Sequence, residues 1–258
     1  MSAAMLEVRH LARAFGGVRA VDDVSFDVAS GELVALIGPN GAGKTTCFNL
    51  LNGQLVPDVG TVTLAGTRID GLPPHRVAHL GVGRTFQVAA TFASMTVREN
   101  VVLALLAHAE RDADVIARAS TQLLADADAL LARVGCADLA DAHCAALPYG
   151  DAKRVELALA LADHPTLLLM DEPTAGLAPR SRAQLMQVAA DLARRESIAV
   201  LFTEHDMDVV FGFADRVIVL DRGRIIAHGS PDAIRADPRV RAVYLGENEP
   251  PERRAESP

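Results

Sequence analysis

The stretch Gly38-Pro39-Asn40-Gly41-Ala42-Gly43-Lys44-Thr45 matches the pattern G-x-x-x-x-G-K-[ST] and decides the fold. Before it, the apolar run Leu33–Ile37 is typical of a strand buried on both faces, and after it Lys44–Asn52 predicts a helix. The glycines let the backbone wrap closely around phosphates, and the N–H groups at the start of the helix point at the anion. Strand, loop and helix together predict a nucleoside triphosphate site rather than an ordinary Gly-rich turn. Lys44 would neutralise the β/γ-phosphates, and the Thr45 hydroxyl would bind Mg²⁺.

A second motif is Leu167-Leu168-Leu169-Met170-Asp171-Glu172-Pro173. Its apolar residues predict a buried strand, and ligands collect at the C-terminal edge of such strands in open α/β sheets. We expect Asp171 to bind the magnesium, directly or through water, and Glu172 to act as general base on the attacking water. The alternative, a strand end followed by a solvated acidic turn, is disfavoured by the phosphate loop in the same chain.

Two single residues could complete such a site. His205 follows the apolar run Ile198–Phe202 and could contact the γ-phosphate and orient the water, although a lone His is more often structural. Gln87 follows Gly83-Arg84-Thr85-Phe86 and could offer its carbonyl to the metal or to the water.

The periodicity of the rest of the chain predicts the fold class. Further strands are expected over Val24–Val28, Thr61–Leu64, Ile198–Thr203, Val217–Leu220 and Arg224–Ala227, the last two as a hairpin across Asp221-Arg222-Gly223. Helices are expected over Lys153–Ala162, Ser181–Arg195 and Met207–Ala214. Strands that alternate with helices imply an α/β fold with a mainly parallel sheet covered on both faces.

Residues 88–150 differ in character and predict a helical insertion. Thr96-Val97-Arg98-Glu99 has the form of a capping box, with an apolar helix following to about Ala107. Asp112–Val134 is rich in Ala, Leu and Asp with helical periodicity. We therefore expect one domain over 1–246, with its core at 1–87 and 151–246 and a helical subdomain at about 88–150. The polar, Pro-rich residues 247–258 predict a disordered tail.

The composition limits the function. The formal net charge of −8 argues against a general nucleic-acid binder. The longest apolar run, Val101–Ala109, is far too short to span a bilayer, so any membrane role needs a partner. Three Cys without C-x-x-C pairing predict reduced, buried thiols, and Cys136, His143 and Cys144 lack a zinc-site spacing.

Taken together, the motifs resemble the nucleotide-binding subunits of ABC transporters. The phosphate loop, Gln87, Leu147-Pro148-Tyr149-Gly150-Asp151, Asp171-Glu172 and His205 follow one another in the order and spacing of that family, over about Met5–Gly246. The resemblance implies an ATPase that uses ATP and Mg²⁺, and a P-loop NTPase (RecA-like) core with a mainly parallel sheet, an N-terminal antiparallel β subdomain and an inserted helical subdomain. Its implied nucleotide-binding residues are Phe15, Gly38, Pro39, Asn40, Gly41, Ala42, Gly43, Lys44, Thr45, Thr46 and Gln87. Its implied catalytic residues are Lys44, Glu172 and His205, and its metal ligands Thr45, Gln87 and Asp171.

The resemblance also implies a dimer with a second copy or a paralogous ATPase. The phosphate loop of one subunit would face the signature segment of the other, through Leu147, Tyr149, Gly150 and Asp151. Gly176-Leu177-Ala178 would form the loop that joins the two sites. Phe15 would stack on adenine, with core packing as the alternative.

The signature departs from the usual Leu-Ser-Gly-Gly-Gln of the family. Pro148, Tyr149 and Asp151 replace its Ser, first Gly and Gln, so one hydroxyl contact is missing and Pro148 offers no N–H. The following helix could still present its N-terminal N–H groups to the γ-phosphate. Because Asp171, Glu172 and His205 are intact, we expect an active enzyme.

Several segments are similar to one subfamily, the importers of branched-chain and other hydrophobic amino acids. They are Phe15-Gly16-Gly17, Leu147-Pro148-Tyr149-Gly150, Thr174–Pro179, Glu204-His205-Asp206-Met207 and Tyr244–Glu247. The subfamily implies membrane-spanning permease subunits, an extracytoplasmic solute-binding protein that acts indirectly, and a peripheral position on the cytoplasmic face of the inner or plasma membrane, without nucleic acid. Val88, Phe92 and Met95 could line a groove for a short partner helix, with core packing equally open for Phe92. Alternatives are import of urea or amides, lipopolysaccharide transport, a soluble ABC protein, or a small-molecule kinase.

Overall fold

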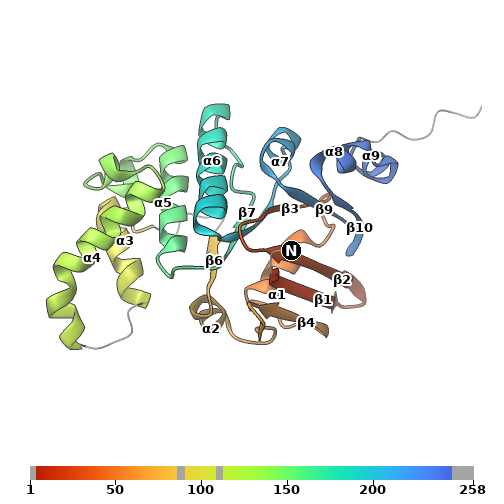
Figure 1. The fold of residues 1–258 in the computed structure, drawn as a ribbon, viewed down its shortest axis with the longest axis horizontal. Helices are drawn as coiled ribbons and strands as arrows, with labels where there is room; N and C mark the ends of the chain where they lie inside the picture. The colour runs from red at the N-terminus through yellow and green to blue at the C-terminus, as the bar shows by residue number, and fades with distance from the viewer. Residues whose placement is uncertain (1–3, 86–90, 109–112, 246–258) are drawn as a thin grey trace, which may run out of the picture.

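The computed structural model describes residues 4–85, 91–108 and 113–245, which form two sheets and a group of helices beside them (Figure 1). Gln87, Val88 and the tail expected over 247–258 lie outside the described residues. The first sheet is antiparallel, with the order β2-β1-β4-β5. Its strands are β1 (Ala4–Phe15), β2 (Val18–Ala29), β4 (Val59–Leu64) and β5 (Thr67–Arg68). The antiparallel N-terminal sheet is thereby confirmed, and the strand expected over Val24–Val28 extends to the 12 residues of β2.

The second sheet has six strands in the order β10-β9-β3-β8-β7-β6. They are β3 (Leu33–Ile37), β6 (Val82–Thr85), β7 (Leu167–Asp171), β8 (Ala199–Thr203), β9 (Arg216–Asp221) and β10 (Arg224–Gly229). All neighbours are parallel except β9 and β10, which form the expected hairpin. The mainly parallel sheet is therefore confirmed.

The helices follow the expected alternation. They are α1 (Lys44–Leu51), α2 (Pro74–His79), α3 (Val97–His108), α4 (Ala113–Arg133), α5 (Tyr149–Leu161), α6 (Pro179–Glu196), α7 (Met207–Phe213), α8 (Pro231–Ala236) and α9 (Pro238–Leu245). Short 3₁₀ turns lie at Ala137–Leu139 and Cys144–Ala146. The start of α5 corrects the expected helix over Lys153–Ala162. Its N-cap is Pro148, whose fixed φ suits a helix entry, so Tyr149 and Gly150 belong to the first turn and not to a loop.

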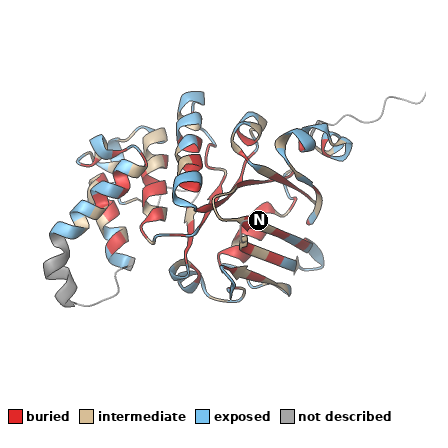
Figure 2. Ribbon diagram, in the orientation of Figure 1, coloured by how far each residue is buried: buried red, intermediate tan, exposed pale blue. Residues whose placement is uncertain are grey.

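The six-stranded sheet lies between two cores, and β3 shows why its sequence is continuously apolar. Leu33, Ala35 and Ile37 face a core shared with α3 to α9, while Val34 and Leu36 face a core shared with α1, α2 and the antiparallel sheet. Every residue of β3, β7 and β8 is buried (Figure 2). Each fully buried aliphatic side chain contributes about 1.5–3 kcal/mol, so the strand ends that carry the site are held firmly.

Helices α3, α4 and α5 pack together at the β6 edge of this sheet (Figure 1). The capping box is confirmed, because Thr96 N donates to Glu99 Oε2 (2.7 Å) and Glu99 N to Thr96 Oγ1 (3.2 Å). The division of the chain at about residues 88 and 150 stays a prediction. Within the described part of the chain, no helix combines the length and the apolar character needed to cross a bilayer.

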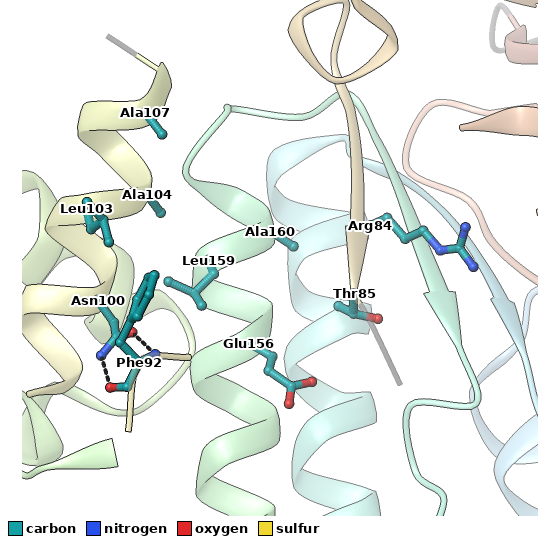
Figure 3. A pocket seen from close by; sticks show the side chains of 10 residues that line it. All are labelled: Arg84, Thr85, Phe92, Asn100, Leu103, Ala104, Ala107, Glu156, Leu159 and Ala160. Carbon is teal, nitrogen blue, oxygen red and sulfur yellow. Dashed lines mark hydrogen bonds between the residues drawn. The ribbon is translucent and has the colours of Figure 1, made fainter. Parts of the chain in front are cut away.

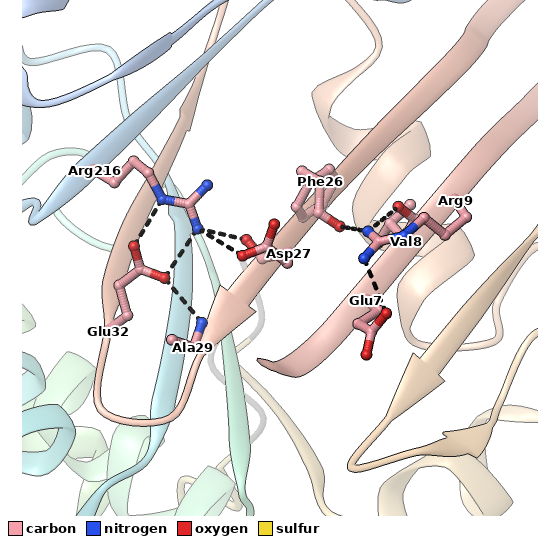
Figure 4. A network of polar contacts seen from close by, with 8 residues as sticks. All are labelled: Glu7, Val8, Arg9, Phe26, Asp27, Ala29, Glu32 and Arg216. Atoms are coloured by element: carbon pink, nitrogen blue, oxygen red, sulfur yellow. Dashed lines mark hydrogen bonds and ion pairs between the residues drawn. The ribbon is translucent and has the colours of Figure 1, made fainter. Parts of the chain in front are cut away.

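A network of polar contacts ties the two sheets together (Figure 4). Arg216, at the start of β9, donates to Glu32 Oε1 (2.7 Å) and Oε2 (2.9 Å) and to the carbonyl of Asp27 on β2 (2.6 Å). On the antiparallel sheet, Arg9 donates to the carbonyl of Phe26 (3.1 Å). The paired Glu32 carboxylate also accepts from Ala29 N (2.9 Å), which fixes the turn that leads into β3 and the phosphate loop.

Candidate functional site

The phosphate loop follows β3 and is pressed against two other strands. A Cβ on Gly38 would lie 2.2 Å from the carbonyl oxygen of Leu220, and a Cβ on Gly43 would lie 2.1 Å from that of Ala20. Gly43 also has a φ of 107°, a backbone conformation that side chains disfavour. Glycine at both positions is therefore a packing requirement, and the path of the loop is fixed by β2 and β9.

Lys44 begins α1 and is buried behind this loop. Its ammonium donates to the carbonyls of Gly38 (2.6 Å) and Pro39 (3.2 Å). Burial lowers the pKa of Lys44, and the carboxylates of Glu172 and Asp171 oppose this shift. The loop cation and both acidic residues at the end of β7 thus act on one another, as the two motifs predicted.

Asp171 ends β7 and is almost wholly buried, with 4% of its side chain exposed. Thr203, its register partner on β8, donates its hydroxyl to Asp171 Oδ1 (2.7 Å). Arg84 on β6 lies 3.3 Å from Asp171 Oδ2 and also donates to Asn49 Oδ1 on α1 (2.8 Å). Neighbours on two elements, β6 and β8, therefore hold the carboxylate, and α1 positions the arginine.

Glu172 and His205 form a pair at the rim of the site. His205 Nε2 lies 2.9 Å from Glu172 Oε1, and both side chains are partly exposed. Glu172 has a φ of 49°, uncommon for a residue with a side chain and frequent at functional sites. Its N–H donates to the hydroxyl (3.0 Å) and carbonyl (3.2 Å) of Thr203, and these bonds hold the unusual conformation.

The remaining nucleotide-binding candidates lie on the surface around this centre. Phe15 ends β1 with 44% exposed, so core packing does not account for it, and the Arg13 guanidinium lies 5.1 Å from its ring centroid. Thr45 is exposed and Thr46 is half-buried at the start of α1. A nucleotide could reach all three, whereas Gln87 lies outside the described residues.

The signature segment forms the start of α5. Tyr149 is 52% exposed, and its ring lies against Gly176, where an added Cβ would meet Cε1 at 3.4 Å. A Cβ on Gly150 would lie 2.8 Å from Ser181 Oγ on α6. Asp151 accepts from Arg154 (2.7 Å). The signature and the loop around Gly176 are thus in direct contact within one subunit.

Sequence reasoning missed Arg84 and Thr203, which hold Asp171. Neither carries a motif of its own, and each reaches Asp171 only because β6 and β8 flank β7. It also missed Glu204, which is buried and accepts from Thr174 N (2.8 Å) and Oγ1 (2.7 Å), joining the two loops that carry Glu172 and His205. The pairing of neighbouring strand ends was the signal available for Thr203.

The donor set suits magnesium bound together with a nucleotide. The exposed Thr45 hydroxyl and the Asp171 carboxylate are hard oxygen ligands of the kind that Mg²⁺ prefers. Mg²⁺ usually takes only one or two such ligands from the protein and completes its coordination with substrate phosphates and water. In the ranges that the structure describes, no group of three or more His, Cys, Asp or Glu side chains is placed to hold a metal by itself. These residues fit a cation that arrives with phosphate ligands.

A groove lies beside this site, between β6, α3 and α5 (Figure 3). It has a volume of about 340 Å³ and is lined by Arg84, Thr85, Phe92, Asn100, Leu103, Ala104, Ala107, Glu156, Leu159 and Ala160. Phe92 is 56% exposed, while its backbone N–H and carbonyl are both bonded to Asn100 (2.7 and 3.1 Å). The alternative expectation, that Phe92 packs in the core, is therefore wrong. Met95, expected in the same groove, instead lines a separate hollow between α3 and α4.

Comparison with known proteins decides the family. The family model described as "ABC transporter" matches residues 21–175, more than half of the chain. The chain belongs to the ABC transporter family. A second model, described as "Branched-chain amino acid ATP-binding cassette transporter", matches residues 224–250 of this ABC ATPase. The P-loop NTPase fold class expected from the sequence is confirmed, and so is the assignment as an ATPase coupled to transport.

Individual relatives match along nearly the whole ABC ATPase. The high-affinity branched-chain amino acid transport ATP-binding protein LivG of Salmonella typhimurium is 40% identical over 256 residues, 96% of this chain and 100% of that protein. The ADP conformation of MJ1267, an ATP-binding cassette of an ABC transporter, is 30% identical with a TM-score of 0.85, over 95% of this chain and 100% of that one. The dimeric structure of MJ0796, a bacterial ABC transporter cassette, is 25% identical with a TM-score of 0.76, over 88% and 99%.

Proposed function

We propose that this ABC ATPase powers the uptake of branched-chain or other hydrophobic amino acids through membrane-spanning partners. The assignment of this cargo rests on the similarity to LivG over nearly the full length of both chains. The match of the C-terminal residues 224–250 to the branched-chain family supports the same cargo. Urea or amides and lipopolysaccharide are the alternative cargoes, and we place the subunit on the cytoplasmic face of the membrane.

The proposed chemistry follows from the contacts at the strand ends. Lys44 binds the β/γ-phosphates when it leaves the loop carbonyls, and Glu172 takes a proton from the attacking water. His205, held 2.9 Å from Glu172, contacts the γ-phosphate and orients that water. Thr45, Asp171 and, outside the described residues, Gln87 would hold Mg²⁺, which neutralises the charge that develops on the phosphates.

The second half of each site comes from a second ATPase subunit in this proposal. The signature residues Leu147, Tyr149, Gly150 and Asp151 would meet the nucleotide held by the phosphate loop of the partner. The exposed Tyr149 and the start of α5, where no described side chain caps the first turn, support this arrangement. The similarity to a dimeric cassette favours a homodimer or a dimer with a paralogue.

The groove between β6, α3 and α5 is the proposed contact with a permease subunit. A short cytoplasmic helix would place its apolar side chains against Phe92, Leu103 and Leu159. Both Arg84 and Thr85 line the groove, and Arg84 also contacts Asp171, so the docked helix would lie directly beside the nucleotide site. The extracytoplasmic solute-binding protein would act on this subunit only through the permease.

Uptake of radiolabelled leucine tests the proposed cargo. Cells whose own copy of the chain is replaced by the Glu172→Gln variant should lose leucine uptake, whereas cells with the wild-type chain retain it. Immunoblotting establishes equal expression, and Glu196→Gln, an exposed substitution on α6, serves as the matched control. Unchanged leucine uptake with a Glu172→Gln variant whose ATP turnover is lost would refute the amino-acid cargo and direct the same assay to urea and amides.

Phe92→Ala should weaken the binding of permease subunits by roughly tenfold, because an aromatic anchor in an interface is worth about 1.4 kcal/mol or more. The backbone of Phe92 stays bonded to Asn100, so the fold should be retained. The measurement is recovery of permease subunits with the affinity-tagged ATPase, together with leucine uptake. Val56→Ala, an equally exposed apolar position far from the groove, is the control. Intact assembly and uptake with Phe92→Ala would exclude Phe92 from the contact.

A further inference from the structure

The mainly apolar groove between β6, α3 and α5 contains a buried carboxylate. Glu156 on α5 has only 4% of its side chain exposed, yet it lines the groove together with Thr85 and Leu159, as Figure 3 shows. Its Oε2 accepts from Lys153 Nζ (2.9 Å), whereas no donor among the described residues reaches Oε1. Burial raises the pKa of Glu156, and the neighbouring Lys153 opposes this shift.

A buried acceptor without a donor is costly, and folded proteins rarely leave one. The other charged residue that lines the groove, Arg84, uses Nη1 to bond to Asn49 and Nη2 to bond to Asp171, and no hydrogen bond joins its buried Nε to Glu156. The groove is also lined by Ala104, Leu159 and Ala160, whose side chains carry no hydrogen-bond donor. A segment that fills the groove is placed to supply the missing donor.

We propose that Glu156 is the polar anchor of this groove, and that its Oε1 accepts a hydrogen bond from a donor side chain carried among apolar residues by the docked permease segment. This inference rests on the proposed function. It defines the chemistry of the partner, because a fully apolar helix would leave the acceptor unpaired and an acidic side chain would be repelled. The carboxylate therefore selects one segment among the many apolar helices that would fit the groove by shape.

The anchor also lies close to the nucleotide site. Glu156 and Lys153 line a second, smaller cavity together with Thr85, Asp171 and Pro173. The docked segment would thus bond to a side chain that shares a cavity with Asp171. A substitution at Glu156 must for this reason be checked for ATP affinity as well as for partner binding.

Two double variants test the role of the hydrogen-bond acceptor at residue 156 separately from that of the buried charge. Lys153→Met/Glu156→Met replaces the buried pair by apolar side chains, a change that folded proteins tolerate better than removal of one partner. Lys153→Met/Glu156→Gln differs from it only at residue 156, where an amide oxygen keeps an acceptor. Asp191→Asn, a half-buried position on α6 outside the groove, controls for the loss of one negative charge.

Binding of the full chain to inside-out membrane vesicles is measured for each variant, with vesicles that contain the permease subunits and with vesicles from cells that lack them. We expect the Met/Met variant to bind permease vesicles roughly tenfold more weakly than wild type, and the Met/Gln variant to stay within about threefold. ATP affinity should be the same in both double variants, and both should be fully folded without urea, with the Met/Gln variant unfolding at the lower urea midpoint because its buried amide lacks partners. Equal binding by the Met/Met and Met/Gln variants, whether strong or weak, would overturn the inference while leaving the proposed function standing. If the wild-type chain does not prefer permease vesicles, both the proposed function and this inference fail.

Discussion

Replacing Glu172 by Gln should lower ATP turnover of the complete transporter by about 10²- to 10⁴-fold, the range that general-base catalysis contributes. Glutamine preserves the shape of the side chain and can still bond to His205, but it cannot take a proton from water. The backbone conformation at residue 172 is held by Thr203 and is independent of the side-chain charge. ATP binding should therefore remain close to that of the wild type.

Phosphate release from the purified complex in vesicles measures this turnover, and equilibrium binding of labelled ATP measures affinity. Glu196→Gln makes the same chemical change at the exposed end of α6, where the amide oxygen can still accept from Arg133, and should leave both quantities unaltered. Turnover by Glu172→Gln at the wild-type rate would remove Glu172 from the reaction and point to another base.

Lys44→Met should reduce ATP affinity by roughly 100-fold, because a charge-assisted hydrogen bond to phosphate is worth about 1.5–3 kcal/mol. The ammonium is buried and donates to the loop carbonyls of Gly38 and Pro39, so it already lies at the phosphate loop before ATP binds. Methionine fills a similar volume. The close approach of Gly38 to Leu220 and of Gly43 to Ala20, which fixes the loop path, does not involve the ammonium.

Titration calorimetry with a non-hydrolysable ATP analogue checks this prediction, and Arg195→Met, which removes an exposed cation from the end of α6, is its control. An unfolding midpoint equal to that of the wild type would show that the loss is one of binding. Wild-type affinity in Lys44→Met would contradict the assignment of this lysine to the phosphates.

The local sequence pattern was sufficient to predict the helices and strands around the site. Leu33–Ile37 coincides with β3 because a strand buried on both faces has an unbroken apolar sequence with sharp ends. Asp171, Glu172 and His205 could be placed together because the C-terminal ends of parallel strands share one edge of a sheet. The capping box at Thr96 was readable because its bonds are local.

What could not be predicted depends on pairing between distant segments. The four-residue strand β6 has no periodicity to detect and contains Gly83, so the position of Arg84 beside Asp171 was not foreseeable. The missing partner of Glu156 Oε1 was equally invisible, since it is defined by what the neighbouring helices do not provide. Sequence patterns describe single helices and strands, whereas these features arise where two or three elements meet.

The paired charges at the end of β7 have a consequence for how the subunit folds before it assembles with its partners. Asp171 and Glu172 are adjacent acids, and Lys44 and Arg84 supply two cations within the same protein. Unbalanced buried charge would destabilise the fold, and the two cations remove that imbalance without help from a ligand. A newly synthesised subunit should therefore fold before it meets ATP, and can wait in its folded form for the membrane components with which it assembles.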